Sequence, residues 1–131
     1  MLSITPIYGS LLALIVVMLA YRVTIFRQKE KIDLGNDLGS DAMKNAIRAH
    51  GNAVESIPIG IVLLLILELN YLTPWLLHFF GLILVISRVM YAWGVSASCG
   101  PSKARFYGAL FAWFILILMI VVNLLLIFTR A

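Results

Sequence analysis

The sequence predicts an all-α integral membrane protein that folds as a single antiparallel bundle of four helices, because of its composition and its four long apolar stretches. Of the 131 residues, 63% are hydrophobic and only 12% are charged. A soluble domain is about 45–50% apolar and about 25% charged. Small folded chains leave much of their surface exposed, so a soluble globule of this length could not bury so many apolar side chains. The composition therefore excludes a soluble domain and a disordered chain.

Each of the four apolar stretches approaches the roughly 20 residues that a helix needs to cross the hydrocarbon core. Backbone exposed to lipid must make its hydrogen bonds internally, so we expect helices in these stretches rather than open strands. Ser40 is expected to cap the second helix, because a serine hydroxyl accepts a hydrogen bond from an N–H group of the first turn. Within one domain spanning 1–131, the expected helices cover residues 3–26, 41–70, 74–95 and 104–129.

The basic residues predict how the bundle is oriented. The second connection has none. The basic residues gather at the first connection, with Arg27, Lys29, Lys31 and Lys44, and at the third, with Lys103 and Arg105. By the positive-inside rule, these two connections face the cytoplasm and both termini face outward. No basic residue precedes the first stretch, and Arg22 follows its uncharged part, so we expect an uncleaved span rather than a signal peptide. Despite a net charge of +4, no basic run is long enough to predict nucleic-acid binding.

Few residues could hold a metal ion. The chain has one cysteine, Cys99, and two histidines, His50 and His78. A multi-cysteine metal site needs more thiols, and the two histidines are too far apart in the chain for a zinc-hydrolase motif. We expect no metal site and no internal disulfide, and the sequence predicts no role for Cys99, His78 or Glu68.

Three polar residues of the second helix are the first candidates for a binding site, because ionisable groups inside a span are costly unless paired or hydrated. Arg48, Asn52 and Glu55 follow one another at i, i+4 and i+7, which places them on one helix face. Glu55 is expected about 10 Å deeper than Arg48, at 1.5 Å rise per residue. Such a column of guanidinium, amide and carboxylate can bind a ligand with both amine and carboxylate groups. It can equally link helices through an internal Arg–Glu pair.

More arginines are expected near the same end of the bundle. Arg88 and Tyr91, at i and i+3 of the third helix, can face the same cavity, although Arg88 fits equally well as a counter-charge for Glu55. Arg22 can snorkel to the membrane surface from the first helix. Arg105 opens the fourth helix, where lipid phosphates can bind it. Four arginines beside one carboxylate exceed what helix packing requires, and they predict an anionic ligand.

The segment from Arg48 to Pro58, Arg-Ala-His-Gly-Asn-Ala-Val-Glu-Ser-Ile-Pro, resembles the second-helix signature of a known family. That family is the membrane-associated proteins in eicosanoid and glutathione metabolism (MAPEG). The likeness covers nearly the whole chain. Positions outside this segment resemble the small bacterial members of the family. Those positions are Arg22-Val23 through Arg27, Gly35, Leu63-Leu64, Gly81 and Arg88-Val89-Met90-Tyr91-Ala92-Trp93-Gly94.

The resemblance implies a homotrimer in a bacterial inner membrane that binds glutathione between neighbouring subunits near the cytoplasmic face. Glutathione would serve as the co-substrate of a transferase or peroxidase acting on lipophilic small molecules that enter from the lipid. The family residues that hold glutathione correspond to Arg48, Asn52 and Glu55 of this chain.

The resemblance also implies roles for residues outside the second-helix column. Arg88 and Tyr91 match third-helix positions that line the glutathione site. Arg22 and His50 match positions that the adjacent subunit contributes. Arg105 is the nearest match to an arginine that stabilises the glutathione thiolate in active transferases. A guanidinium beside a thiol favours the nucleophilic thiolate, which gives this role a physical basis.

Two departures from the family pattern leave the enzymatic function open. Ser56 follows the motif glutamate where the leukotriene-synthase-like members carry a tyrosine, and Val95 stands where they place a second tyrosine. Losing both hydroxyls weakens the implied transferase more than the implied glutathione binding. The alternative is a non-catalytic trimer that binds a lipid or another anionic amphiphile, and an accessory subunit without a ligand also stays open. A small multidrug exporter is disfavoured, because residues 1–26 lack the acidic residue that those exporters carry in the first span.

Overall fold

The computed structural model describes residues 3–35, 38–97 and 102–130, and these residues form four α-helices and no strand. All four helices are long and apolar enough to cross a membrane. The chain is therefore an all-α integral membrane protein with a four-helix bundle, as the sequence predicts. Cys99 lies outside the described residues. The helices are α1 (Thr5–Glu30), α2 (Asp41–Leu69), α3 (Pro74–Ala97) and α4 (Lys103–Arg130).

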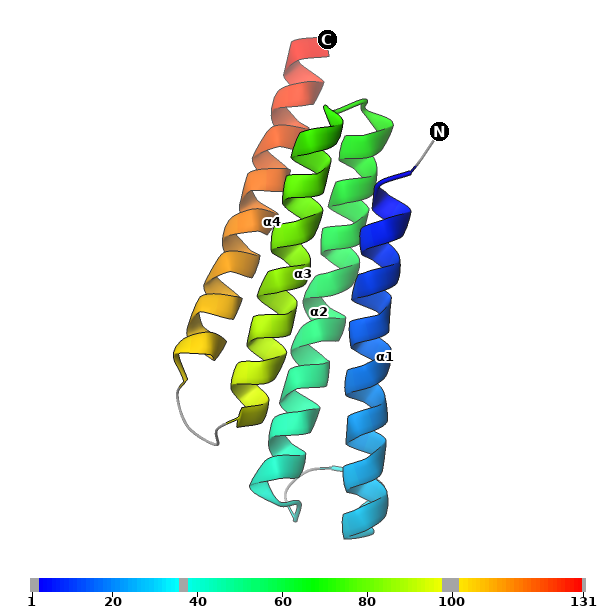
Figure 1. The fold of residues 1–131 in the computed structure, drawn as a ribbon, viewed down its shortest axis with the longest axis vertical. Coiled ribbons are helices and arrows are strands. Elements are labelled where there is room, and N and C mark those ends of the chain that lie inside the picture. Colours follow the sequence, from blue (N-terminus) through cyan, green and yellow to red (C-terminus); the bar gives the residue numbers. More distant parts are fainter. Residues whose placement is uncertain (1–2, 36–37, 98–101, 131) are drawn as a thin grey trace.

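Each helix runs antiparallel to the one before it (Figure 1). The start of α1 and the end of α4 lie at the same end of the bundle as the turn between α2 and α3, and the other two connections lie at the opposite end (Figure 1). The most extensive helix contact is between α3 and α4, and within the described ranges α1 and α4 do not touch. That the end with the first and third connections faces the cytoplasm stays a prediction.

Polar contacts at the first connection fix the start of α2. Ser40 caps α2 as expected, since its Oγ accepts a hydrogen bond from the Met43 N–H at 3.1 Å. The helix α1 extends to Glu30, past the expected end at residue 26. The Glu30 carboxylate accepts hydrogen bonds from the Ser40 N–H, at 2.8 Å, and from the Ser40 hydroxyl. The end of α1 is thereby tied to the beginning of α2.

Glu68, near the end of α2, caps the start of α1. One carboxylate oxygen accepts from the N–H groups of Ser3 at 2.7 Å and Ile4 at 2.9 Å, and the other accepts from Thr5 at 2.6 Å. The first N–H groups of a helix have no partner inside the helix, and the N-cap residue Ile4 supplies no side-chain cap. The sequence predicts no role for Glu68, and the structure shows a capping role.

Two glycines allow α3 and α4 to approach closely beside the predicted site. A Cβ atom on Gly94 would collide with the backbone of Ala104 and Arg105, and one on Gly108 would collide with the backbone of Tyr91. Small residues at such positions are how helices pack in membranes, where no hydrophobic force between helices assists. This contact places the first turns of α4 against the part of α3 that carries Tyr91.

Candidate functional site

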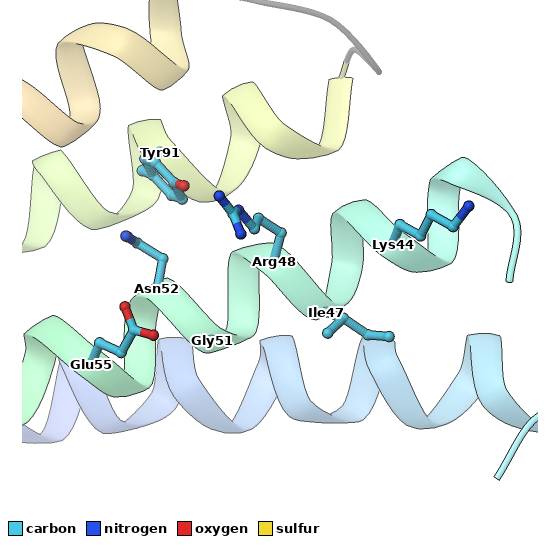
Figure 2. A pocket seen from close by; sticks show the side chains of 7 residues that line it. All are labelled: Lys44, Ile47, Arg48, Gly51, Asn52, Glu55 and Tyr91. Atoms are coloured by element: carbon cyan, nitrogen blue, oxygen red, sulfur yellow. The ribbon is translucent and has the colours of Figure 1, made fainter. Parts of the chain in front are cut away.

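An open pocket of about 370 Å³ lies between the first half of α2 and α3 (Figure 2). The predicted column of α2 and the predicted tyrosine of α3 both contribute to it. The lining residues of α2 form one face of the helix, because successive ones are either adjacent or three positions apart. The lining residues are Lys44, Ile47, Arg48, Gly51, Asn52, Glu55 and Tyr91.

The pocket carries charges of both signs. Arg48 and Asn52 point from α2 toward Tyr91, and Glu55 follows further along the same helix (Figure 2). Arg48 and Glu55 are both exposed in the single chain. Within the described ranges neither has a hydrogen-bond or ion-pair partner, so the internal Arg–Glu link that the spacing left open is not formed. A carboxylate inside a span is costly unless it is paired or hydrated, so Glu55 is open to water or to a partner from outside this chain.

Arg88 lies behind the pocket lining and is only 3% exposed. Its Nη1 donates to the Asn52 Oδ1 at 2.8 Å and to the Ser56 Oγ at 2.6 Å, and its Nη2 donates to the Gly108 carbonyl at 3.3 Å. These acceptors belong to α2 and α4, so Arg88 joins three helices. Its polar partners among the described residues are neutral, and it is not the counter-charge of Glu55.

Tyr91 is 8% exposed and forms the part of the pocket wall that comes from α3. The Arg88 Cζ lies 5.7 Å from the centroid of the Tyr91 ring. That distance is within the range of a cation–π contact, which orients the ring against the buried guanidinium. Of the two residues predicted to face the cavity, Tyr91 therefore lines the pocket and Arg88 lies beneath the lining.

Arg22 and His50 are outside the pocket lining of the single chain. The Arg22 Nη1 donates to the Ser96 hydroxyl, and its Cζ lies 5.7 Å from the centroid of the Phe26 ring. Arg22 therefore links α1 to the last turn of α3. His50 is half-buried on another face of α2. The roles that the resemblance implies for these two residues involve a neighbouring subunit and stay predictions.

Arg105 lies in the first turn of α4 and is half-buried. Its backbone N–H donates to the Ser102 Oγ at 3.2 Å, and its backbone lies against Gly94. Gly94 stands three residues after Tyr91, about one helical turn along α3. The side chain of Arg105 does not line the pocket, and its proposed role toward a bound thiol stays a prediction.

Three lining residues and two partners of Arg88 were not predicted from the sequence. Lys44 and Gly51 stand three or four positions from members of the column, and Ile47 stands three positions after Lys44 and four before Gly51. Applying the helical spacing to the neighbouring positions would have found all three. Gly108 and Ser56 meet Arg88 through the packing of three helices. A carbonyl on another helix leaves no signal in the sequence.

Comparison with known proteins agrees with this architecture. The MAPEG family model matches residues 5–125. The inner membrane protein YecN of Escherichia coli (strain K12) is 35% identical over 121 residues, which cover 92% of this chain and 90% of that protein. YecN of Escherichia coli O6:H1 shows the same identity and coverage. Every pocket residue lies inside the matched range. The extent of the family match and the identity to YecN show that the chain belongs to the MAPEG family.

Proposed function

We propose that the pocket binds glutathione and that the protein is a glutathione S-transferase or peroxidase of a bacterial inner membrane. The observation that carries this proposal is the pair Arg48 and Glu55, which line one pocket and have no partner within the described ranges. Glutathione offers both carboxylates and an amine, so it complements both charges. Membership of the MAPEG family supports glutathione as the ligand, and the relative named as an inner membrane protein supports the location.

In the proposed complex, the ligand lies along α2. A glutathione carboxylate pairs with Arg48, whose planar guanidinium can bind it through two parallel hydrogen bonds. Lys44 adds positive charge beside Arg48, and the amine of the γ-glutamyl group pairs with Glu55. Asn52 lies between them, and Tyr91 closes the opposite wall. The thiol then lies toward α3 and the start of α4.

A homotrimer is part of the proposal. Arg48 and Glu55 are exposed in the single chain, and a neighbouring copy packed against α2 would shield them from lipid, which reduces the cost of their charges. His50 does not line the pocket of its own chain, and Arg22 lies near the same end of the bundle. These two side chains are the ones that we expect a neighbouring copy to contribute.

The proposed chemistry starts from the glutathione thiolate. A thiol with a pKa of about 8.5 is mostly protonated at neutral pH, and the Arg105 guanidinium would favour its deprotonated form. The thiolate sulfur attacks an electrophilic carbon of a lipophilic substrate, forming a C–S bond while the leaving group departs with its bonding electrons. In the peroxidase reaction, the sulfur attacks a hydroperoxide oxygen and an alcohol leaves. A second glutathione then reduces the sulfenic acid, giving a disulfide and water.

Changing Arg105 to alanine is expected to lower kcat by about 100-fold, because a charge that stabilises the reacting anion is lost. At a pH where the bound thiol stays protonated, the affinity for glutathione should not change, since Arg105 does not line the pocket. Conjugation of a lipophilic aryl halide in detergent micelles measures kcat, and ultraviolet absorbance of the thiolate measures its formation. The matched control is Lys103→Ala, which removes an exposed charge from the same helical turn. An equal loss in both variants, or in neither, would contradict this role of Arg105.

A second function is favoured by the residues at the two family tyrosine positions. The Ser56 hydroxyl accepts from Arg88 and donates to the Asn52 carbonyl at 2.7 Å, and Val95 is buried and apolar. Neither residue lines the pocket. A non-catalytic trimer that binds a lipid or another anionic amphiphile would need no such hydroxyl. Turnover above the uncatalysed rate eliminates this alternative, and bound phospholipid in a folded preparation without glutathione affinity supports it.

A further inference from the structure

The buried guanidinium of Arg88 determines which end of the Asn52 side chain faces the pocket. The Arg88 Nη1 lies 2.8 Å from the Asn52 Oδ1. Arginine only donates hydrogen bonds, so the atom opposite it must be the carboxamide oxygen. The Asn52 amide nitrogen is thereby turned away from Arg88, and within the described ranges it has no hydrogen-bond partner. Asn52 lines the pocket, so its N–H groups are the part that remains for a ligand (Figure 2).

Arg88 is itself held in place from three sides. It contacts Asn52 and the Ser56 hydroxyl on α2 and the Gly108 carbonyl on α4. The Ser56 hydroxyl is fixed in turn, because it donates to the Asn52 carbonyl at 2.7 Å. Both terminal nitrogens of the guanidinium are engaged on neighbouring helices, and only its Nε lacks a partner among the described residues. With 3% exposure, the Arg88 side chain does not reach into the pocket. Its effect on a ligand must pass through Asn52.

We propose that Arg88 is a positioning residue that presents the amide N–H groups of Asn52 to an acceptor on the bound ligand, either a carboxylate or a peptide carbonyl. This inference rests on the proposed function, because it takes a peptide-like ligand to occupy the pocket. The column of α2 then has three distinct subsites. Arg48 binds an anion, Asn52 binds an acceptor and Glu55 binds an amine. The middle subsite selects against an amine, which has no acceptor to offer when protonated.

Changing Asn52 to aspartate tests this role without removing the link between helices. The aspartate carboxylate keeps a charge-assisted bond to Arg88, so the bundle should unfold at the same or a higher temperature. It replaces the two N–H donors with an acceptor oxygen, so the Kd for glutathione should rise by about 10- to 100-fold. If Asn52 only ties α2 to α3, the variant will bind glutathione as tightly as the wild type, and that result would overturn the proposal.

The matched control is Asn45→Asp. Asn45 is on the same helix and half-buried but outside the pocket lining, and the substitution makes the same change in charge. Its Kd for glutathione should equal that of the wild type. Equal weakening in both variants would mean that added negative charge, and not the orientation of Asn52, reduces binding, and it would overturn the proposal.

The side-chain amide of Asn52 also gives a readout that needs no ligand. In protein labelled at asparagine, its nuclear magnetic resonance signal is identified by its loss in Asn52→Asp. We expect its protons to exchange rapidly with water, and we expect Arg88→Lys to shift the signal, because one ammonium cannot replace the fork of donors. Protected protons in the free protein would overturn the orientation. Rapid exchange in a wild-type protein that binds no glutathione would refute the proposed function while supporting the positioning role of Arg88.

Discussion

Changing Glu55 to glutamine is expected to raise the Kd for glutathione by about 10- to 100-fold, because the ligand amine loses a charge-assisted partner. The substitution keeps the size of the side chain and removes only its charge. Glu55 is exposed and has no partner within the described ranges, so the bundle itself should not be destabilised. Calorimetric titration of the detergent-purified protein gives the Kd.

A glutathione analogue without the amine makes this first test specific to the proposed contact. The wild type should bind the analogue about as weakly as Glu55→Gln binds glutathione, and Glu55→Gln should not distinguish the two ligands. The control variant Asp33→Asn removes an exposed carboxylate outside the helices and should bind like the wild type. Undiminished preference for the amine in Glu55→Gln would remove Glu55 from the site.

Changing Gly108 to valine is expected to destabilise the bundle by about 1–3 kcal/mol or more, as overpacking of a tight contact does. A Cβ at this position would lie 2.6 Å from the Tyr91 nitrogen and 3.0 Å from the Ser87 carbonyl oxygen. Backbone atoms cannot give way as the end of a flexible side chain can, so α3 and α4 must separate. The Gly108 carbonyl would also withdraw from Arg88.

Unfolding by denaturant in detergent measures this second effect. The control is Gly51→Ala, since a Cβ on Gly51 meets nothing within 4 Å. Alanine favours a helix over glycine by about 1 kcal/mol, so this variant should be as stable as the wild type or more stable. A Gly108→Val protein that unfolds like the wild type would show that α3 and α4 do not pack as closely as described.

Most of the fold follows from the sequence, because the membrane requirement acts on local composition. Apolar length alone predicts four spans, and Ser40 marks the start of α2 by a local capping pattern. The end of α1 is less predictable, since the polar residues that precede Glu30 are compatible with either a helix or a loop. Glu68 could not be identified as a cap, because it acts on N–H groups more than 60 positions away in the chain.

The candidate site, too, is predictable from the sequence only in part. The column of Arg48, Asn52 and Glu55 follows from the period of one helix, and the structure places all three in one pocket. The position of the Arg88 side chain depends on how α3 is rotated about its axis relative to α2 and α4. No local sequence pattern determines that rotation. Arg88 contacts neutral groups instead of Glu55, and we propose that it acts on a ligand through Asn52.

The pairing of Arg48 with a glutathione carboxylate is the central claim, and calorimetric titration of wild type beside Arg48→Ala tests it most directly. The wild type and the control Lys29→Ala, which removes an exposed charge outside the pocket, should bind glutathione saturably. Arg48→Ala should bind about 100-fold more weakly, as loss of one partner from a hydrogen-bonded charge pair does. No binding by folded wild-type protein, or equal affinity in Arg48→Ala, would contradict the account.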